Sequence, residues 1–287
     1  MASNMKAVKL RIKSVQSTMQ ITKAMELVAS SKLRRAKERA ENARPYFQEL
    51  HNTLKDIANG NTDFSSVYAR EADNGKVCYV VIGGDRGLAG GYNSNLFKKL
   101  ESEAAGTDYL VLPVGKKPVE YFRRRNVELL TDQFGEIADI SVSDCFTMAN
   151  ILCKEYKAGR FGHVQLCYTI FVSMLSQHPD LFPVLPLNDL SEDLDPEHIR
   201  QIRDLILYEP NASEVFDDIV PEYLAGLIYG AVCESVASEL AARRMAMDSA
   251  TKNAEEMIDT LQLHYNRARQ ASITQEITEI VAGAEGV

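Results

Sequence analysis

The 287-residue sequence lacks the features that indicate a membrane span, a secreted fold or a metal site. No run of about 18 apolar residues occurs, so we expect no transmembrane helix. The first ten residues, MASNMKAVKL, contain no apolar signal-peptide core, so we expect no secretion. The five cysteines form no CxxC pair, and this spacing predicts reduced, buried thiols rather than disulfides or zinc ligands.

Motifs of common catalytic sites are absent as well. The sequence contains neither GxSxG nor HExxH, and its five histidines have no carboxylate or cysteine partner at motif spacing. We therefore expect no catalytic residue, no bound metal and no cofactor. A Ser/His/Asp site assembled from distant parts of the chain stays open, although no sequence feature points to it.

Charge is distributed unevenly along the chain. Residues 1–45 contain eleven lysines and arginines against three acidic residues, a net charge of +8. Because the whole chain carries −8, the remaining residues carry −16. A basic, serine-containing start is compatible with a transit peptide or a nucleic-acid-binding arm, but the favoured interpretation is the solvated face of a long helix.

Apolar and small residues recur near the N-terminus at alternating spacings of three and four. The series is Met5, Val8, Ile12, Val15, Met19, Thr22, Glu26, Ala29, Leu33, Ala36, Ala40, Ala43, Phe47, Leu50, Leu54 and Ile57. This repeat continues for about seven heptads and predicts a coiled-coil helix roughly 80 Å long. We expect Pro45 to kink or restart that helix.

Two members of this series, Thr22 and Glu26, interrupt the apolar seam. Around them the apolar residues move to another face of the helix, which carries Ile21, Ala24, Met25 and Val28. A two-helix coiled coil needs only one apolar stripe. The second stripe therefore predicts either contact with an outside partner or packing against a third helix of the same chain.

The middle of the chain has a different pattern. Apolar runs predict strands at 76–82, 108–114 and 163–172, with helices at 93–105, 117–125 and 144–158 between them and one more strand at 204–210. Alternating strands and helices predict a Rossmann-like α/β domain with a mostly parallel sheet.

A glycine-rich turn, VVIGGDRGLAGGYNSN, follows the first predicted strand and resembles a phosphate-binding loop. Its glycines fit neither GxGxxG nor GxxxxGK[ST], and Asp85 places a negative charge where a phosphate would bind. We therefore interpret the loop as structural. The residues that we expect to shape this structural loop are Asp85, Arg86, Gly87, Gly90 and Gly91.

The C-terminal part predicts a second long helix. Asn211 and Glu214 form a capping-box pattern, and no proline follows Pro221. A three-four spacing returns in Met247, Ala250, Ala254, Met257 and Leu261. We expect a long N-terminal helix (1–60), an α/β domain (75–205) and a long C-terminal helix (211–287), with the two helices forming an antiparallel coiled coil.

Three stretches of the sequence are similar to the gamma subunit of F-type ATP synthases. They are RIKSVQSTMQITKAMELVASSKLRRA (11–36), DRGLAGGYNSNLFK (85–98) and a C-terminal block from Ala237 to Ala284. Ala89 stands where cysteine is frequent in the family. The Cys-bearing insertion of chloroplast forms is missing, so the chain resembles the bacterial type.

The resemblance implies a rotor shaft that couples ion flow through a c-ring to ATP chemistry on beta subunits. It implies alpha, beta and epsilon subunits and the c-ring as partners, no nucleic acid, and a peripheral place on the cytoplasmic face of the bacterial plasma membrane. The expected residues of coupling contacts with partners are Ile21, Lys23, Met25, Val28, Arg269, Gln270, Thr274, Gln275 and Glu276.

Two other classes of function stay open from the residues alone. A nucleotide-using α/β enzyme that oligomerises through its helices predicts binding of ATP or NAD by the isolated chain. A coiled-coil nucleic-acid scaffold predicts salt-dependent binding to duplex DNA, but the charge of −16 outside the first 45 residues argues against it.

Overall fold

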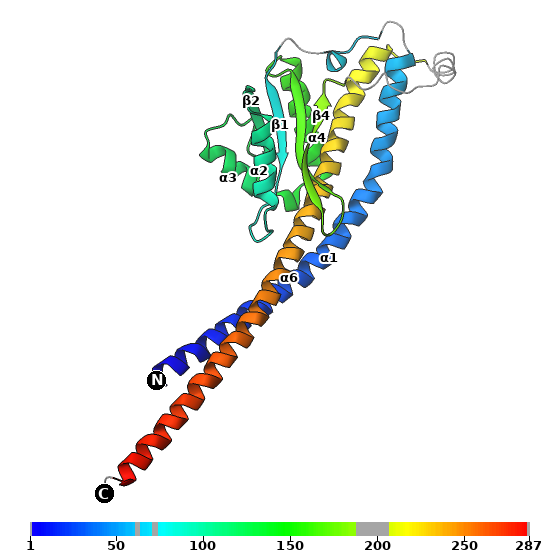
Figure 1. Ribbon diagram of the computed structural model, residues 1–287. Helices are drawn as coiled ribbons and strands as arrows, with labels where there is room; N and C mark the ends of the chain where they lie inside the picture. Colours follow the sequence, from blue (N-terminus) through cyan, green and yellow to red (C-terminus); the bar gives the residue numbers. More distant parts are fainter. Residues whose placement is uncertain (1, 61–63, 71–73, 188–206, 286–287) are drawn as a thin grey trace. The chain divides into compact units, whose positions relative to one another are not determined.

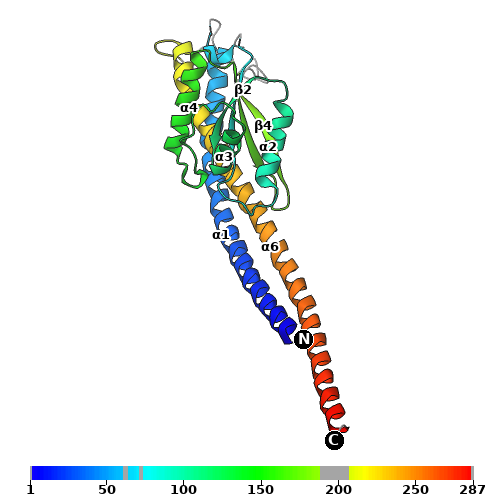
Figure 2. The same ribbon diagram turned by 90° about the vertical axis from the view of Figure 1, so that its left-hand side faces the viewer.

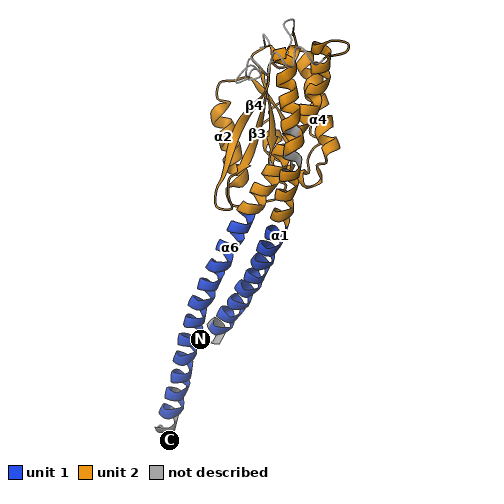
Figure 3. Ribbon diagram, turned by 90° about the vertical axis from the view of Figure 1, so that its right-hand side faces the viewer, with its two compact units in different colours: residues 1–31, 243–287 blue, residues 32–242 orange. Residues whose placement is uncertain are grey.

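The structure is a computed structural model that describes residues 2–60, 64–70, 74–187 and 207–285. Two compact units divide the chain: residues 1–31 with 243–287 form the first unit, and residues 32–242 form the second (Figure 3). Two long helices, α1 (Ala2–Gly60) and α6 (Ala212–Glu285), contribute to both units. Pro45 lies inside α1 and Pro221 lies inside α6, so α1 does not restart at Pro45, and the alternative of a kink there stays a prediction.

The first unit is an antiparallel coiled coil of the two chain ends. Thr22 contacts Thr251 and Glu26 contacts Arg244, so the pairing runs in opposite directions along the two helices (Figure 2). Every position of the predicted seam in this unit is buried or half-buried, including Thr22 and Glu26. The expected coiled coil is therefore confirmed, with polar residues inside its seam.

The seam of α6 in this unit shares Met247, Ala254 and Leu261 with the predicted series but uses another phase between them. Its buried residues are Met247, Thr251, Ala254 and Ile258. Ala250 is half-buried, like most positions of the α1 seam, whereas Met257 is 45% exposed, so the expectation that Met257 belongs to the seam was wrong. Both phases satisfy a three-four spacing, and the one with a threonine is used because the Thr251 hydroxyl has a partner there.

The second unit contains a four-stranded sheet with helices on both faces (Figure 1). Its elements are η1 (Val67–Ala69), β1 (Val77–Ile82), α2 (Tyr92–Glu103), β2 (Tyr109–Val114), α3 (Lys116–Arg124), η2 (Ile137–Asp139), α4 (Val142–Lys157), β3 (His163–Phe171) and β4 (Gln177–Leu185). The strand order is β2-β1-β3-β4; β1 pairs in parallel with β2 and β3, and β4 runs antiparallel to β3.

Alternate residues of the sheet build two separate cores, as the pleat of a strand requires. Cys78, Val80 and Ile82 face a core that contains α4 and parts of the long helices. Val77, Tyr79 and Val81 face a smaller core built with α2 and α3. All six residues of β1 are buried, because a parallel strand covered on both faces has no solvent side.

The three predicted strands and three predicted helices of this unit are confirmed to within about two residues. The edge strand β4 was not predicted, because Pro179 and Pro183 lie inside it and proline is confined to edge strands. The strand expected at 204–210 falls partly outside the described residues, and residues 207–210 form no strand.

All five cysteines are buried and free. Burial raises the pKa of the Cys145 and Cys167 thiols to about 12, and it also raises the pKa of Cys78, Cys153 and Cys233. These thiols therefore stay protonated at neutral pH. One window of α6 is apolar enough to span a membrane, but 72% of it is buried inside the fold, as in a core helix.

Candidate functional site

The second apolar stripe of α1 is exposed in the first unit. Ile21 is 58% exposed and Val28 is 55% exposed, while Met25 is half-buried. Leu27, which the sequence analysis did not single out, is exposed as well, and so is Lys23. Apolar side chains that gather on a surface in this way are typical of a protein interface.

Hydroxyl groups in the seam explain why the stripe lies outside. Thr22 Oγ1 and Thr251 Oγ1 lie 2.8 Å apart, and each hydroxyl also lies within hydrogen-bond distance of a carbonyl of its own helix, that of Met19 or Met247. The Thr22 hydroxyl cannot donate to both acceptors at once, so Thr251 donates to Thr22 when Thr22 donates to Met19. Because these buried polar groups are satisfied within the pair, the stripe residues are not needed to hold the helices together.

The C-terminal end of α6 extends past α1. Since Thr22 faces Thr251 in an antiparallel pair, residue 2 lies level with roughly residue 271, whereas α6 continues to Glu285 (Figure 2). The last part of α6 is thus a single helix among the described residues. It carries four exposed apolar side chains, Ile273, Ile277, Ile280 and Val281, of which Ile280 is 70% exposed.

The polar residues expected to take part in coupling lie near this end. Arg269, Gln270, Thr274, Gln275 and Glu276 are all exposed. Lys23 lies level with roughly residue 250, which is 19 residues or about 28 Å along the helix from Arg269. The structure therefore presents two separate surfaces, one at Ile21–Val28 and one at 269–281, rather than a single site.

The glycine loop connects β1 to α2 in the second unit. Asp85 accepts hydrogen bonds from the backbone N–H groups of Lys116, Ile137 and Ala138. Gly90 has φ +58°, a left-handed conformation that favours glycine, whereas Gly91 has φ −85° and does not require it. Arg86 and Gly87 are exposed.

The same loop packs closely against α6. A Cβ atom on Gly84 would lie 2.8 Å from the carboxylate of Glu239, so no larger residue fits without a shift of that side chain. The Tyr92 hydroxyl donates to the carbonyl of Ser235, 3.1 Å away. The geometry of the loop is thus that of a joint between the sheet and the helix.

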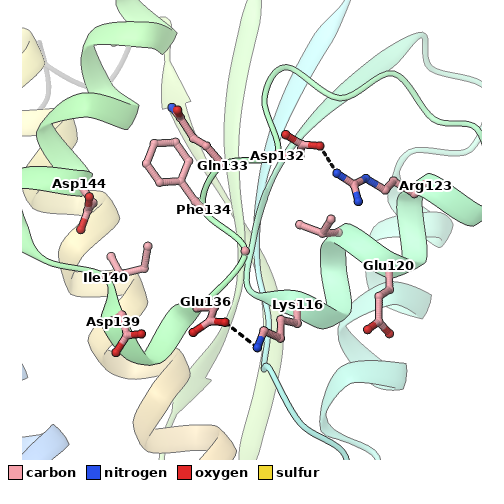
Figure 4. Close-up of a pocket in the computed structure, with 12 residues that line it drawn as sticks. Lys116, Glu120, Arg123, Asp132, Gln133, Phe134, Glu136, Asp139, Ile140 and Asp144 are labelled. Atoms are coloured by element: carbon pink, nitrogen blue, oxygen red, sulfur yellow. Dashed lines mark hydrogen bonds and ion pairs between the residues drawn. The ribbon is translucent and has the colours of Figure 1, made fainter.

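A cavity of about 610 Å³ lies beside α3 (Figure 4). It is lined by Lys116, Val119, Glu120, Arg123, Asp132, Gln133, Phe134, Gly135, Glu136, Asp139, Ile140 and Asp144. Lys116 Nζ lies 2.6 Å from Glu136 Oε1, and this contact raises the pKa of Lys116 and lowers that of Glu136. Arg123 forms an ion pair with Asp132.

The chemistry of this cavity is limited by its lining. None of the lining residues is a histidine, cysteine or serine, so the cavity offers no imidazole, thiol or serine hydroxyl group. Across the described ranges, no group of three or more His, Cys, Asp or Glu side chains is placed to hold a metal ion. The sequence analysis missed the cavity because it forms from segments 116–144 that share no motif.

Comparison with known proteins decides the family. A family model described as ATP synthase matches residues 4–287. The ATP synthase gamma chain of Ruminococcus albus is 48% identical, in an alignment that covers 97% of this chain and 96% of that one. The chain belongs to the ATP synthase gamma chain family.

Other gamma chains are similar over their full length. That of Lachnoclostridium phytofermentans is 41% identical over 99% of both chains, and the sodium ion specific gamma chain of Acetobacterium woodii is 39% identical over 100% of both. A chain from the Euglena gracilis mitochondrial ATP synthase, covering 100% of this chain and 95% of that one, has a TM-score of 0.71 at 20% identity. The gamma-chain fold expected from the sequence, an α/β domain inserted between two long helices, is thereby confirmed.

Proposed function

We propose that this gamma chain is the central rotor shaft of an F-type ATP synthase. The observation that carries the proposal is its full-length similarity to gamma chains, at 48% identity to the relative from Ruminococcus albus. In this role the chain couples transmembrane ion flow through a c-ring to ATP synthesis and hydrolysis at beta-subunit sites. The chain itself is then a non-catalytic subunit without a cofactor.

The antiparallel coiled coil supplies the shaft of this rotor. Its seam is satisfied internally, so Ile21, Val28 and the isoleucines after residue 271 are available to a surrounding ring of alpha and beta subunits. Apolar contacts of this kind lack the directionality of hydrogen bonds, which suits a surface that must slide. Polar residues such as Lys23, Arg269 and Glu276 then supply contacts that depend on the rotation angle.

The α/β domain serves as the foot of the rotor in this proposal. It would bind the epsilon subunit and rest on the c-ring, which places the chain peripherally at the cytoplasmic face of a bacterial plasma membrane. In this proposal, residues 1–60 and 211–287 form the shaft, and residues 75–205 form the foot domain. Family membership supports this division.

Purification from the cell tests the proposal. A tagged copy of the chain should bring alpha, beta and epsilon subunits with it in defined stoichiometry, and membrane vesicles that contain the complex should take up ions when ATP is added. The proposal would be contradicted if the chain purified without these partners and bound ATP or NAD saturably in equilibrium dialysis. That result would favour a nucleotide-using enzyme.

A further inference from the structure

Three backbone segments converge at the carboxyl ends of β1 and β2. The N–H of Gly83 donates to the carbonyl of Val114 at 3.0 Å, and the N–H of Lys117 donates to the carbonyl of Gly84 at 3.0 Å. The N–H of Gly115 donates to the carbonyl of Phe134 at 2.9 Å. These bonds join the glycine loop, the start of α3 and the segment before η2.

The carboxylate of Asp85 lies where these segments meet. Its Oδ1 atom accepts from the N–H of Lys116 at 3.1 Å and from the N–H of Ile137 at 3.0 Å, and Oδ2 accepts from the N–H of Ala138 at 3.3 Å. Lys116 is the first residue of α3, and Ile137 is the first residue of η2. The first N–H groups of a helix have no acceptor within that helix.

This place in an α/β fold is usually taken by a ligand. In nucleotide-binding α/β domains, the glycine loop after the first strand directs helix N–H groups at a bound phosphate. Here the anion is part of the chain and lies within the loop itself. The donors here belong to α3 and η2 rather than to the loop or to α2, and the loop supplies the anion that they bind.

We propose that Asp85 is a built-in anion: its carboxylate fills an oxyanion cradle formed by the N–H groups of Lys116, Ile137 and Ala138, and thereby positions the glycine loop. The other side of the loop meets α6, through Gly84 at Glu239 and through Tyr92 at Ser235. Asp85 is thus a positioning residue for the joint between sheet and helix. It also excludes phosphate groups from the cradle. The inference does not depend on the rotor function.

Chemical rescue of the full chain tests the inference. The variant Asp85→Ala should melt about 4–10 °C below the wild type, because three N–H groups lose a charged acceptor. Sodium formate at about 0.3 M should then raise the melting temperature of the variant by about 3 °C, because a small carboxylate enters the empty cradle. This increase should level off as the formate concentration rises. Sodium chloride at the same ionic strength should not raise the melting temperature.

Two controls separate this effect from a general salt effect. The wild type and Asp108→Ala, which removes an exposed carboxylate outside the loop, should show no saturable response to formate. An equal response of all three proteins, or an Asp85→Ala variant that melts at the wild-type temperature, would overturn the inference.

A second variant keeps the test decisive if Asp85→Ala does not fold. Asp85→Asn retains the shape of the side chain but carries no charge, and it leaves no room for formate. We expect it to melt below the wild type and not to respond to formate. An Asp85→Asn chain as stable as the wild type would show that the anionic charge is not required.

Discussion

A single residue, Gly115, determines how closely the loop that follows β2 approaches the loop that follows β1. Gly115 has φ +100°, and a Cβ atom placed there would lie 2.2 Å from the carbonyl oxygen of Gly83. Any side chain at this position would strain the backbone and would also clash with a backbone atom. Gly87 in the neighbouring loop has neither restriction.

The variant Gly115→Ala should therefore lower the free energy of unfolding by at least about 2 kcal/mol. The matched variant Gly87→Ala should change it by no more than about 0.5 kcal/mol. Urea denaturation of both chains measures the difference. Equal stabilities would mean that the two loops separate without cost.

A cluster of charges links three segments near the amino ends of β1 and β3. Glu128 Oε2 lies 2.8 Å from Lys76 Nζ, and Glu128 Oε1 lies 2.7 Å from Arg160. The hydrogen bonds from Lys76 and then from Arg160 lower the pKa of Glu128 below its usual value of 4.5. A carboxylate with a lowered pKa stabilises the fold above its unfolded pKa, and this contribution disappears as the pH falls through the folded value.

We therefore expect Glu128→Gln to lower the melting temperature at pH 7 and to have a progressively smaller effect as the pH falls below the usual value of 4.5. Melting curves of the variant and the wild type between pH 3 and pH 8 give the comparison. Glu49→Gln, which removes an exposed carboxylate from α1, serves as a charge control. A destabilisation that persists unchanged at pH 3 would indicate lost packing instead of a lost ion pair.

At the scale of elements, the seam of the coiled coil depends on small and polar residues. Ala254 is 7% exposed and follows the Thr251 contact on the same face of α6. A leucine at this position would overfill the space between the helices, which costs about 1–3 kcal/mol.

Thermal melting of Ala254→Leu should thus reveal a clear loss of stability. Asn253→Leu, one residue earlier on the exposed side of the helix, should stay within about 0.5 kcal/mol of the wild type. If both variants melt alike, Ala254 does not lie in the seam.

Much of the element structure was predictable from periodicity. The α1 seam continues through Thr22 and Glu26, although polar residues there looked like an interruption. Periodicity could not choose between two phases in α6, because the Thr22–Thr251 contact that decides joins residues 229 positions apart. Strand β4 was missed because Pro179 and Pro183 lie inside it, and the cavity beside α3 was missed because its lining comes from several segments that share no motif.

At the scale of the whole molecule, substitutions in the exposed stripe of α1 test the rotor proposal. Met25→Ser combined with Val28→Ser removes apolar surface that is only partly buried in the free chain. The melting temperature of the free chain should fall little, because the seam is intact. In the assembled complex, ATP-driven ion uptake into vesicles should decrease more than ATP hydrolysis does.

Paired measurements on the same vesicles distinguish the outcomes. Gln20→Ser, an exposed polar position on the same helix, is expected to leave both rates unchanged. An equal loss of uptake and hydrolysis in the double variant would argue against a coupling role for the stripe. A large fall in the melting temperature of the free chain would assign the stripe to internal packing.

The burial of all five cysteines has a practical consequence for optical experiments. A maleimide dye or a bead linker reacts with thiolates, and the raised pKa of these thiols together with their burial protects them in the folded state. One cysteine introduced at an exposed position of α6 would then be the single point of attachment. Rotation of individual molecules could be followed by light without first removing any native cysteine.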